Sequence, residues 1–167
     1  MYDELTEVDI KKMQEEIDHR VRVLRPQLIE EVQTARAFGD LSENFEYKCA
    51  KQAKNRNESR IRYLERMIRT AKVIEVKGKD GTVGLFDKVT IYNEMVKKEM
   101  TIQIVTTLRQ DALKGLISKE SPVGKALMGH KAGERVQVTL DDTRKYFVEI
   151  RSIEKGFDDE NLDISAY

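Results

Sequence analysis

The stretch "FGDLSENFEY", residues 38–47, lies between two long segments with helical periodicity and predicts that the chain reverses direction there. Gly39 can end the first helix, and the short polar residues that follow it are typical of a turn. Two helices of similar length joined by a few residues fold most simply into an antiparallel hairpin. The turn also holds two carboxylates three residues apart, Asp40 and Glu43, and a chain reversal alone does not require them.

The segment before the turn predicts one long helix. From about Leu5 to Phe38, apolar residues recur every three or four positions, as on a helix with a single apolar stripe. Thr6 and Asp9 predict a capping box at the start of this helix. Pro26 predicts a local kink or a lost hydrogen bond, because proline has no backbone N–H.

The segment after the turn predicts a second helix, from Tyr47 to Ala71. Its apolar stripe is interrupted at Asn57, and the later part has the spacing of a coiled-coil seam. At 1.5 Å per residue, about 30 residues of helix give a rod of roughly 45 Å, with the turn at one end.

Charge is unevenly distributed along the predicted hairpin. Residues 48–72 contain nine Lys or Arg and two acids, whereas residues 1–31 contain nine acids and five bases. Ion pairs between the two helices would use much of this charge. The basic residues nearest the turn, Arg36, Lys48 and Lys51, would alternatively face a polyanion. Both interpretations remain open on the sequence alone.

Short alternating or β-branched runs replace the helical period after Val73 and predict an antiparallel sheet. Within this part, Ser121 and Pro122 predict the N-cap and first position of a short helix that ends at Gly129.

The chain is therefore expected to belong to the α+β class, with three parts. Residues 1–77 form the helical hairpin, residues 78–153 form the sheet domain, and the acidic residues 154–167 form a mobile tail.

Composition excludes several classes of protein. The formal net charge of the 167 residues is zero, which disfavours a globally basic nucleic-acid binder. The single cysteine, Cys49, cannot form an internal disulfide or a cysteine-rich zinc site. No apolar run approaches the roughly 20 residues that span a bilayer, and the N-terminus is acidic where a signal peptide would be basic. We expect a cytoplasmic protein without a membrane partner.

Asp40 and Glu43 admit two interpretations. As a capping box, Asp40 would accept a hydrogen bond from the N–H of residue 43, and Glu43 would reach back to it. As metal ligands, they would be half of a magnesium site, because Mg²⁺ is usually held by one or two carboxylates together with phosphates and water. A partner would have to supply the remainder. The two histidines, His19 and His130, are isolated in sequence, and no complete catalytic constellation is present.

Three segments of this chain resemble a known family. "ARAFGDLSENFEYKCAKQ", "ESRIRYLERMIRTAKVIE" and "LISKESPVGKALMGHKAGERVQV" closely resemble the bacterial transcript cleavage factors GreA and GreB, and are nearer to GreA. The resemblance covers about residues 5–153. It implies an antiparallel coiled coil that enters the secondary channel of RNA polymerase and a small FKBP-like domain that docks at the mouth of that channel.

The resemblance also implies roles for individual residues. Asp40 and Glu43 would be the acids at the tip of the coiled coil that help to hold a Mg²⁺ shared with the polymerase, and Ser42 would support them. Arg36, Lys48 and Lys51 would lie near the 3′ end of the nascent RNA. Ser121 and Pro122 would contact the polymerase. The protein would then be a monomer and not itself an enzyme, since the polymerase would cut its own backtracked RNA.

Two departures from the family pattern keep other functions open. Phe45 stands where the family usually has Ala, and the run before "LIS" lacks the usual Gly-x-x-Glu-Ala-Asp. A channel-binding regulator that inhibits or tunes transcription without supporting cleavage is the main alternative. A peptidyl-prolyl isomerase is a third, although a fold does not carry an activity with it.

Overall fold

The computed structural model describes residues 3–39, 44–78 and 80–165, and the chain divides into two compact units. The helical unit comprises residues 10–71, and the β unit comprises residues 3–9 together with the chain from residue 72 onward. The predicted α+β class is confirmed. The helical unit ends at Ala71, whereas the sequence placed the boundary near Gly78, and residues 3–9 belong with the β unit.

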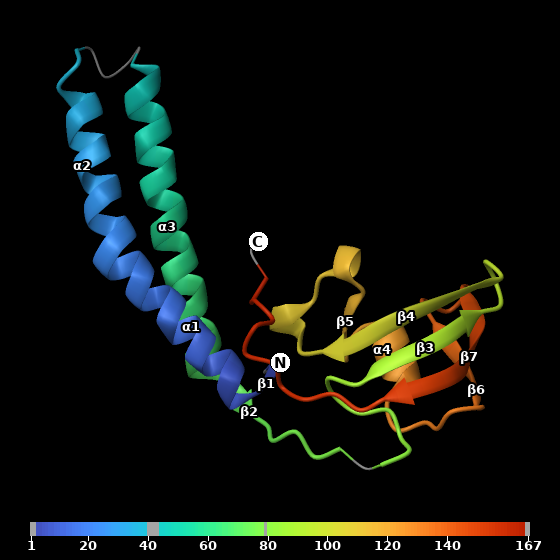
Figure 1. Ribbon diagram of the computed structural model, residues 1–167. Helices are drawn as coiled ribbons and strands as arrows, with labels where there is room; N and C mark the ends of the chain where they lie inside the picture. The colour runs from blue at the N-terminus through green and yellow to red at the C-terminus, as the bar shows by residue number, and fades with distance from the viewer. Residues whose placement is uncertain (1–2, 40–43, 79, 166–167) are drawn as a thin grey trace. The chain divides into compact units, whose positions relative to one another are not determined.

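The helical unit is an antiparallel hairpin, as predicted (Figure 1). α1 (Glu7–His19), the π-helical segment η1 (Arg20–Leu24) and α2 (Arg25–Arg36) follow one another, and α3 (Phe45–Thr70) runs back beside them. None of the helices in the described ranges is long and apolar enough to cross a bilayer.

The π-helical segment accounts for the proline that interrupts the first helix. Arg25 N–H donates to the carbonyl of Arg20, five residues back, instead of four. Pro26 cannot donate, and its ring would clash with the carbonyl of Arg22 in a regular α-helix. One wider turn avoids this clash. The predicted disturbance is therefore a π turn directly before Pro26.

The predicted capping box is present at the start of α1. Thr6 N–H donates to Asp9 Oδ2 at 3.0 Å, and Asp9 N–H donates to Thr6 Oγ1 at 3.3 Å. These reciprocal bonds satisfy two backbone donors that a helix start would otherwise leave free.

A polar layer fills the gap that Asn57 leaves in the apolar stripe. Arg20 Nη1 donates to Asn57 Oδ1 at 3.0 Å, and Asn57 Nδ2 donates to the Arg20 carbonyl at 3.3 Å. Glu16 accepts from Arg60 Nε at 2.8 Å and from Arg20 Nε at 3.0 Å. Because a polar side chain in a helical seam finds its partners in one alignment only, this layer fixes the register of the hairpin.

We expect Glu16→Gln to lower the free energy of unfolding by about 1–2 kcal/mol near neutral pH, because a charge-assisted bond to a 5% exposed Arg60 is lost. Burial acts to raise the pKa of Glu16, but the hydrogen bonds from Arg60 and Arg20 outweigh it and hold the pKa below 4.5. A carboxylate with a lowered pKa contributes stability above its unfolded pKa and loses it as the pH falls through the folded one. The difference between wild type and variant should therefore shrink below about pH 4.5.

Urea unfolding followed by circular dichroism at several pH values measures this difference. Glu15→Gln, an exposed change of the same kind on the same helix, is the matched control and should change stability by less than about 0.5 kcal/mol. A pH-independent loss in Glu16→Gln would contradict the assigned role.

The β unit is built on a five-stranded sheet in the order β5-β4-β3-β7-β6. Its strands are β3 (Lys88–Asn93), β4 (Lys98–Val105), β5 (Leu116–Ser118), β6 (Arg135–Thr139) and β7 (Lys145–Glu154). Alternate residues of β3 and β6 are buried, which gives the sheet one core face. Leu127 of α4 (Pro122–Leu127) belongs to this core.

The prediction of a purely antiparallel sheet is wrong in one respect. β5 pairs with β4 in parallel, while the other three pairs of the sheet are antiparallel. β5 has only three residues, too few for a periodic signal. A second parallel pair joins β1 (Glu4–Leu5) to β2 (Lys72–Val73), so that Glu4 and Leu5 are held in the β unit.

The C-terminal segment differs from the expected mobile tail. Glu154 ends β7, and residues 155–165 lie against the β unit. Gly156 N–H donates to Asp87 Oδ1 at 3.0 Å, and Ser165 N–H donates to the Leu108 carbonyl at 2.6 Å. Between them, Asp158 pairs with the buried Arg109, a contact that a search for periodicity does not detect.

Candidate functional site

The two ends of the hairpin turn define the position of the candidate site. Asp40, Ser42 and Glu43, predicted as the tip residues, lie outside the described residues. On one side, α2 ends at Arg36, and Ala37 N–H still bonds the carbonyls of Gln33 and Thr34. On the other side, α3 begins at Phe45.

Asn44 is the N-cap of α3. Its Oδ1 accepts from Tyr47 N–H at 3.0 Å, and its Nδ2 donates to the Ala35 carbonyl on the opposite helix at 2.7 Å. One amide side chain therefore caps α3 and ties it to α2, which a carboxylate cannot do because it does not donate. The N-cap of α3 is therefore Asn44, and not Asp40 as the capping-box interpretation required.

Basic side chains from both helices gather around Tyr47, close to the turn. The Arg36 guanidinium lies 5.7 Å from the centre of the Tyr47 ring. The pKa of Tyr47 is lowered, chiefly by a hydrogen bond from Arg36, with the charges of Lys51 and Lys54 acting in the same direction. The structure thus brings together Arg36 and Lys51, which are far apart in sequence. Lys48 is exposed in the first turns of α3.

Ion pairs between the helices form in the middle of the hairpin. Arg60 pairs with Glu16, and Arg25 pairs with Glu58 at 2.7 Å. Neither Lys48 nor Lys51 has an ion-pair partner among the residues that the structure describes. The pairing interpretation therefore holds away from the turn, and Lys48 and Lys51 are exposed within the part of the chain that the structure describes.

Phe45 is the first residue of α3, and its side chain is 76% exposed. Its exposure places a large apolar group directly beside the turn. Any narrow binding site that accepts the turn must also accept this ring.

The residues predicted to contact a polymerase lie in the β unit. Ser121 caps α4, with its Oγ accepting from Gly124 N–H at 3.1 Å and donating to the Ser118 carbonyl at 2.6 Å. Pro122 follows as the first residue of α4 and is exposed. The predicted N-cap and first helical position are confirmed.

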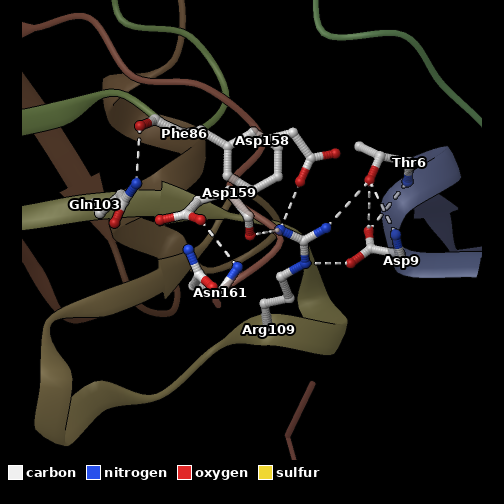
Figure 2. Close-up of polar contacts among 8 residues, drawn as sticks. All are labelled: Thr6, Asp9, Phe86, Gln103, Arg109, Asp158, Asp159 and Asn161. Carbon is white, nitrogen blue, oxygen red and sulfur yellow. Dashed lines mark hydrogen bonds and ion pairs between the residues drawn. The ribbon is translucent and has the colours of Figure 1, made fainter. Parts of the chain in front are cut away.

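A buried cluster around Arg109 was not predicted. The Arg109 guanidinium contacts Thr6, Asp9 and residues 158–159 of the C-terminal segment (Figure 2). The sequence shows Arg109 and an acidic C-terminus, but no spacing or motif connects the two. In the described ranges no group of three His, Cys, Asp or Glu side chains could hold a metal ion.

Comparison with known proteins places the whole chain in one family. Residues 4–73 match the family model for the N-terminal part of a transcription elongation factor, and residues 78–155 match that for the C-terminal part of GreA/GreB. The chain is 41% identical over 150 residues to transcription elongation factor GreA of Mesoplasma florum, covering 89% of this chain and 96% of that protein. It is 37% identical over 153 residues to GreA of Oenococcus oeni, covering 91% and 94%.

Among solved structures, the transcription factor Gfh1 resembles the chain with 23% identity and a TM-score of 0.45, over 92% of this chain and 97% of that one. Both family models and the curated relatives agree over nearly the full length. The chain therefore belongs to the GreA/GreB family of transcription elongation factors.

Proposed function

We propose that this protein binds in the secondary channel of bacterial RNA polymerase and stimulates the polymerase to cut its own backtracked RNA. The hairpin turn would reach the active centre and present Asp40 and Glu43 there, with Ser42 beside them. Ser121 and Pro122 would contact the rim of the channel. The proposed place of action is the bacterial cytoplasm, with the protein acting as a monomer.

The observation that carries the proposal is the assignment of Asn44 as the N-cap of α3. Because Asn44 fills the N-cap position of α3, the capping-box interpretation of Asp40 and Glu43 loses its support, and two acids in a turn between long helices call for another role. The exposed basic residues Arg36, Lys48 and Lys51 support the same proposal, since a positive surface next to the turn favours RNA phosphates.

Magnesium fits the proposed site only in part. Two carboxylates supply at most part of an octahedral oxygen shell, so the polymerase and the RNA must supply the rest. When bound, the ion would activate water and stabilise charge on the phosphodiester. The contribution of this chain is to deliver the carboxylates and to position them, and we expect no Mg²⁺ site in the isolated protein.

RNA cleavage in stalled, backtracked elongation complexes tests the proposal. With Mg²⁺ present, the wild-type protein should accelerate the release of a 3′ RNA fragment relative to complexes without it. If it competes for the channel yet releases no fragment, it acts as an inhibitor. The exposed Phe45 ring is the observation that supports this second function. In that case Phe45→Ala should restore cleavage.

Lys51→Ala is expected to reduce the rate of cleavage of RNAs with long backtracked segments by roughly 3- to 10-fold, because one exposed charge contact is worth about 1 kcal/mol. The loss should diminish as the salt concentration rises. Arg69→Ala, in the last turn of α3, is the matched control, since it lies roughly 27 Å away along the helix at 1.5 Å per residue. Equal effects of both substitutions would show that only overall charge matters.

A further inference from the structure

The C-terminal segment, residues 155–165, crosses the β unit and is fixed at both ends. At its start, Lys155 Nζ donates to Asp87 Oδ2 at 2.7 Å and Gly156 N–H donates to Asp87 Oδ1 at 3.0 Å. At its end, the N–H and Oγ of Ser165 both donate to the Leu108 carbonyl, at 2.6 and 2.7 Å. The segment therefore has fixed contacts with two separate parts of the β unit.

The middle of the segment contacts the buried guanidinium of Arg109 (Figure 2). Asp158 Oδ1 lies 2.5 Å from Nη1 in an ion pair, and Nη1 also donates to the Asp159 carbonyl at 3.2 Å. On the other side of the guanidinium, Nε donates to Asp9 Oδ1 at 2.6 Å, and Nη2 lies 3.5 Å from Thr6 Oγ1. Three distant parts of the sequence thus meet at one side chain.

Burial makes these contacts energetically important. The side chains of Arg109 and Asp9 are fully buried, and that of Asp158 is 16% exposed. A buried guanidinium is stable only when its charge is paired and its N–H groups are bonded. Asp158 Oδ1 is buried without a hydrogen bond to any described residue, so the ion pair with Arg109 is what compensates its burial.

The backbone of the segment fits closely against the β unit. A Cβ at Gly156 would lie 1.8 Å from the Phe86 carbonyl oxygen, so no other residue fits there without movement. The Phe86 ring in turn lies 5.1 Å from the Arg109 guanidinium. Leu162 packs against the hydrophobic core. The segment thus has steric, apolar and ionic contacts, as a bound peptide has.

The family model for the C-terminal part of GreA/GreB matches residues 78–155. The contacts made by residues 156–165 therefore lie outside the matched region. We propose that the β unit carries a binding site for an acidic, extended peptide, built around Arg109, and that the chain's own residues 156–165 occupy this site. Binding of the segment holds Arg109 against Asp9 and so stabilises the capped start of the chain.

Amide hydrogen exchange of the full-length protein, measured by NMR, tests the proposal. In wild type the amides of Gly156 and Ser165 should be protected. Asp158→Asn should increase their exchange rates by about 10- to 100-fold, because a charge-assisted contact is lost. The amide of Thr6, 152 positions away in sequence, should also exchange faster, since Thr6 and Asp9 share the Arg109 guanidinium.

Asp159→Asn is the matched control. Asp159 contacts Arg109 through its backbone carbonyl, whereas its carboxylate accepts from Asn161 N–H at 2.9 Å, which an Asn can also do. In Asp159→Asn the exchange rates of the Gly156, Ser165 and Thr6 amides should stay within about threefold of wild type. Equal effects of the two substitutions, or unprotected Gly156 and Ser165 amides in wild type, would overturn the proposal.

Gly156→Ala provides an independent variant that changes no charge. It should release the segment by steric conflict and raise the exchange rates of Ser165 and Thr6 together. If Ser165 is released while Thr6 keeps its protection, the segment does not stabilise the start of the chain, and the proposal fails in that part.

Discussion

Replacing Asp40 with Asn is expected to abolish the stimulation of RNA cleavage while leaving binding to the polymerase nearly unchanged. Asn has the same shape but lacks the negative charge with which a carboxylate attracts Mg²⁺. Loss of a metal-binding carboxylate removes several kcal/mol of stabilisation at the reacting phosphate, which corresponds to a loss of rate on the order of 100-fold or more. Glu43→Gln should have the same effect. Fragment release from backtracked complexes measures the rate, and a competition assay measures binding.

Glu46→Gln is the matched control for both substitutions. Glu46 lies in the first turn of α3, three residues after Glu43, and the change removes the same charge. It should retain most of the stimulation. Thermal unfolding of Asp40→Asn should shift little, since the N-cap of α3 is Asn44. Loss of polymerase binding in Asp40→Asn would show that the turn has a structural role, and an equal loss of cleavage in Glu46→Gln would show that any acid near the turn suffices.

Asp9→Ala is expected to lower the free energy of unfolding by about 3–5 kcal/mol, because it removes the fully buried one of the two carboxylates that pair with the buried Arg109. The same substitution removes the acceptor for Thr6 N–H at the start of α1. Urea unfolding followed by circular dichroism measures the loss. Glu7→Ala, an exposed acid in the first turn of the same helix, should cost less than about 1 kcal/mol.

A triple substitution separates the ion pairs from general damage to the fold. Asp9→Ala combined with Arg109→Met and Asp158→Ala removes the buried guanidinium and both carboxylates that pair with it, and it should be more stable than Asp9→Ala alone, because an apolar side chain can replace a buried charge at little cost. A loss below about 1 kcal/mol in Asp9→Ala, or additive losses in the triple variant, would contradict a coupled buried cluster.

Local patterns in the sequence determined the hairpin and several of its details. A stripe of apolar residues at helical spacing predicts a helix whatever the rest of the chain does, because the period belongs to the helix itself. The capping box of Thr6 and Asp9 and the cap at Ser121 likewise involve residues three apart, so a short window contains all the information. A sheet after Val73 was also predicted, because β3, β4, β6 and β7 each have five residues or more and are long enough for an alternating pattern to show.

Other features depended on residues that only the tertiary structure brings together. The N-cap of α3 is Asn44, whose amide also donates to the Ala35 carbonyl on the opposite helix. A contact with the opposite helix cannot be read from the local sequence. β5 pairs in parallel with β4, and its three residues are too few for an alternating pattern to predict it.

The Arg109 cluster depends most completely on the tertiary structure. Arg109 is 100 positions from Asp9 and 49 from Asp158, and only burial makes their charges depend on one another. In a solvated chain the same three residues would interact weakly, because water screens their charges. The sequence alone therefore determined the helices, the caps at Thr6 and Ser121 and the longer strands, whereas the fold decided which distant polar groups are buried together.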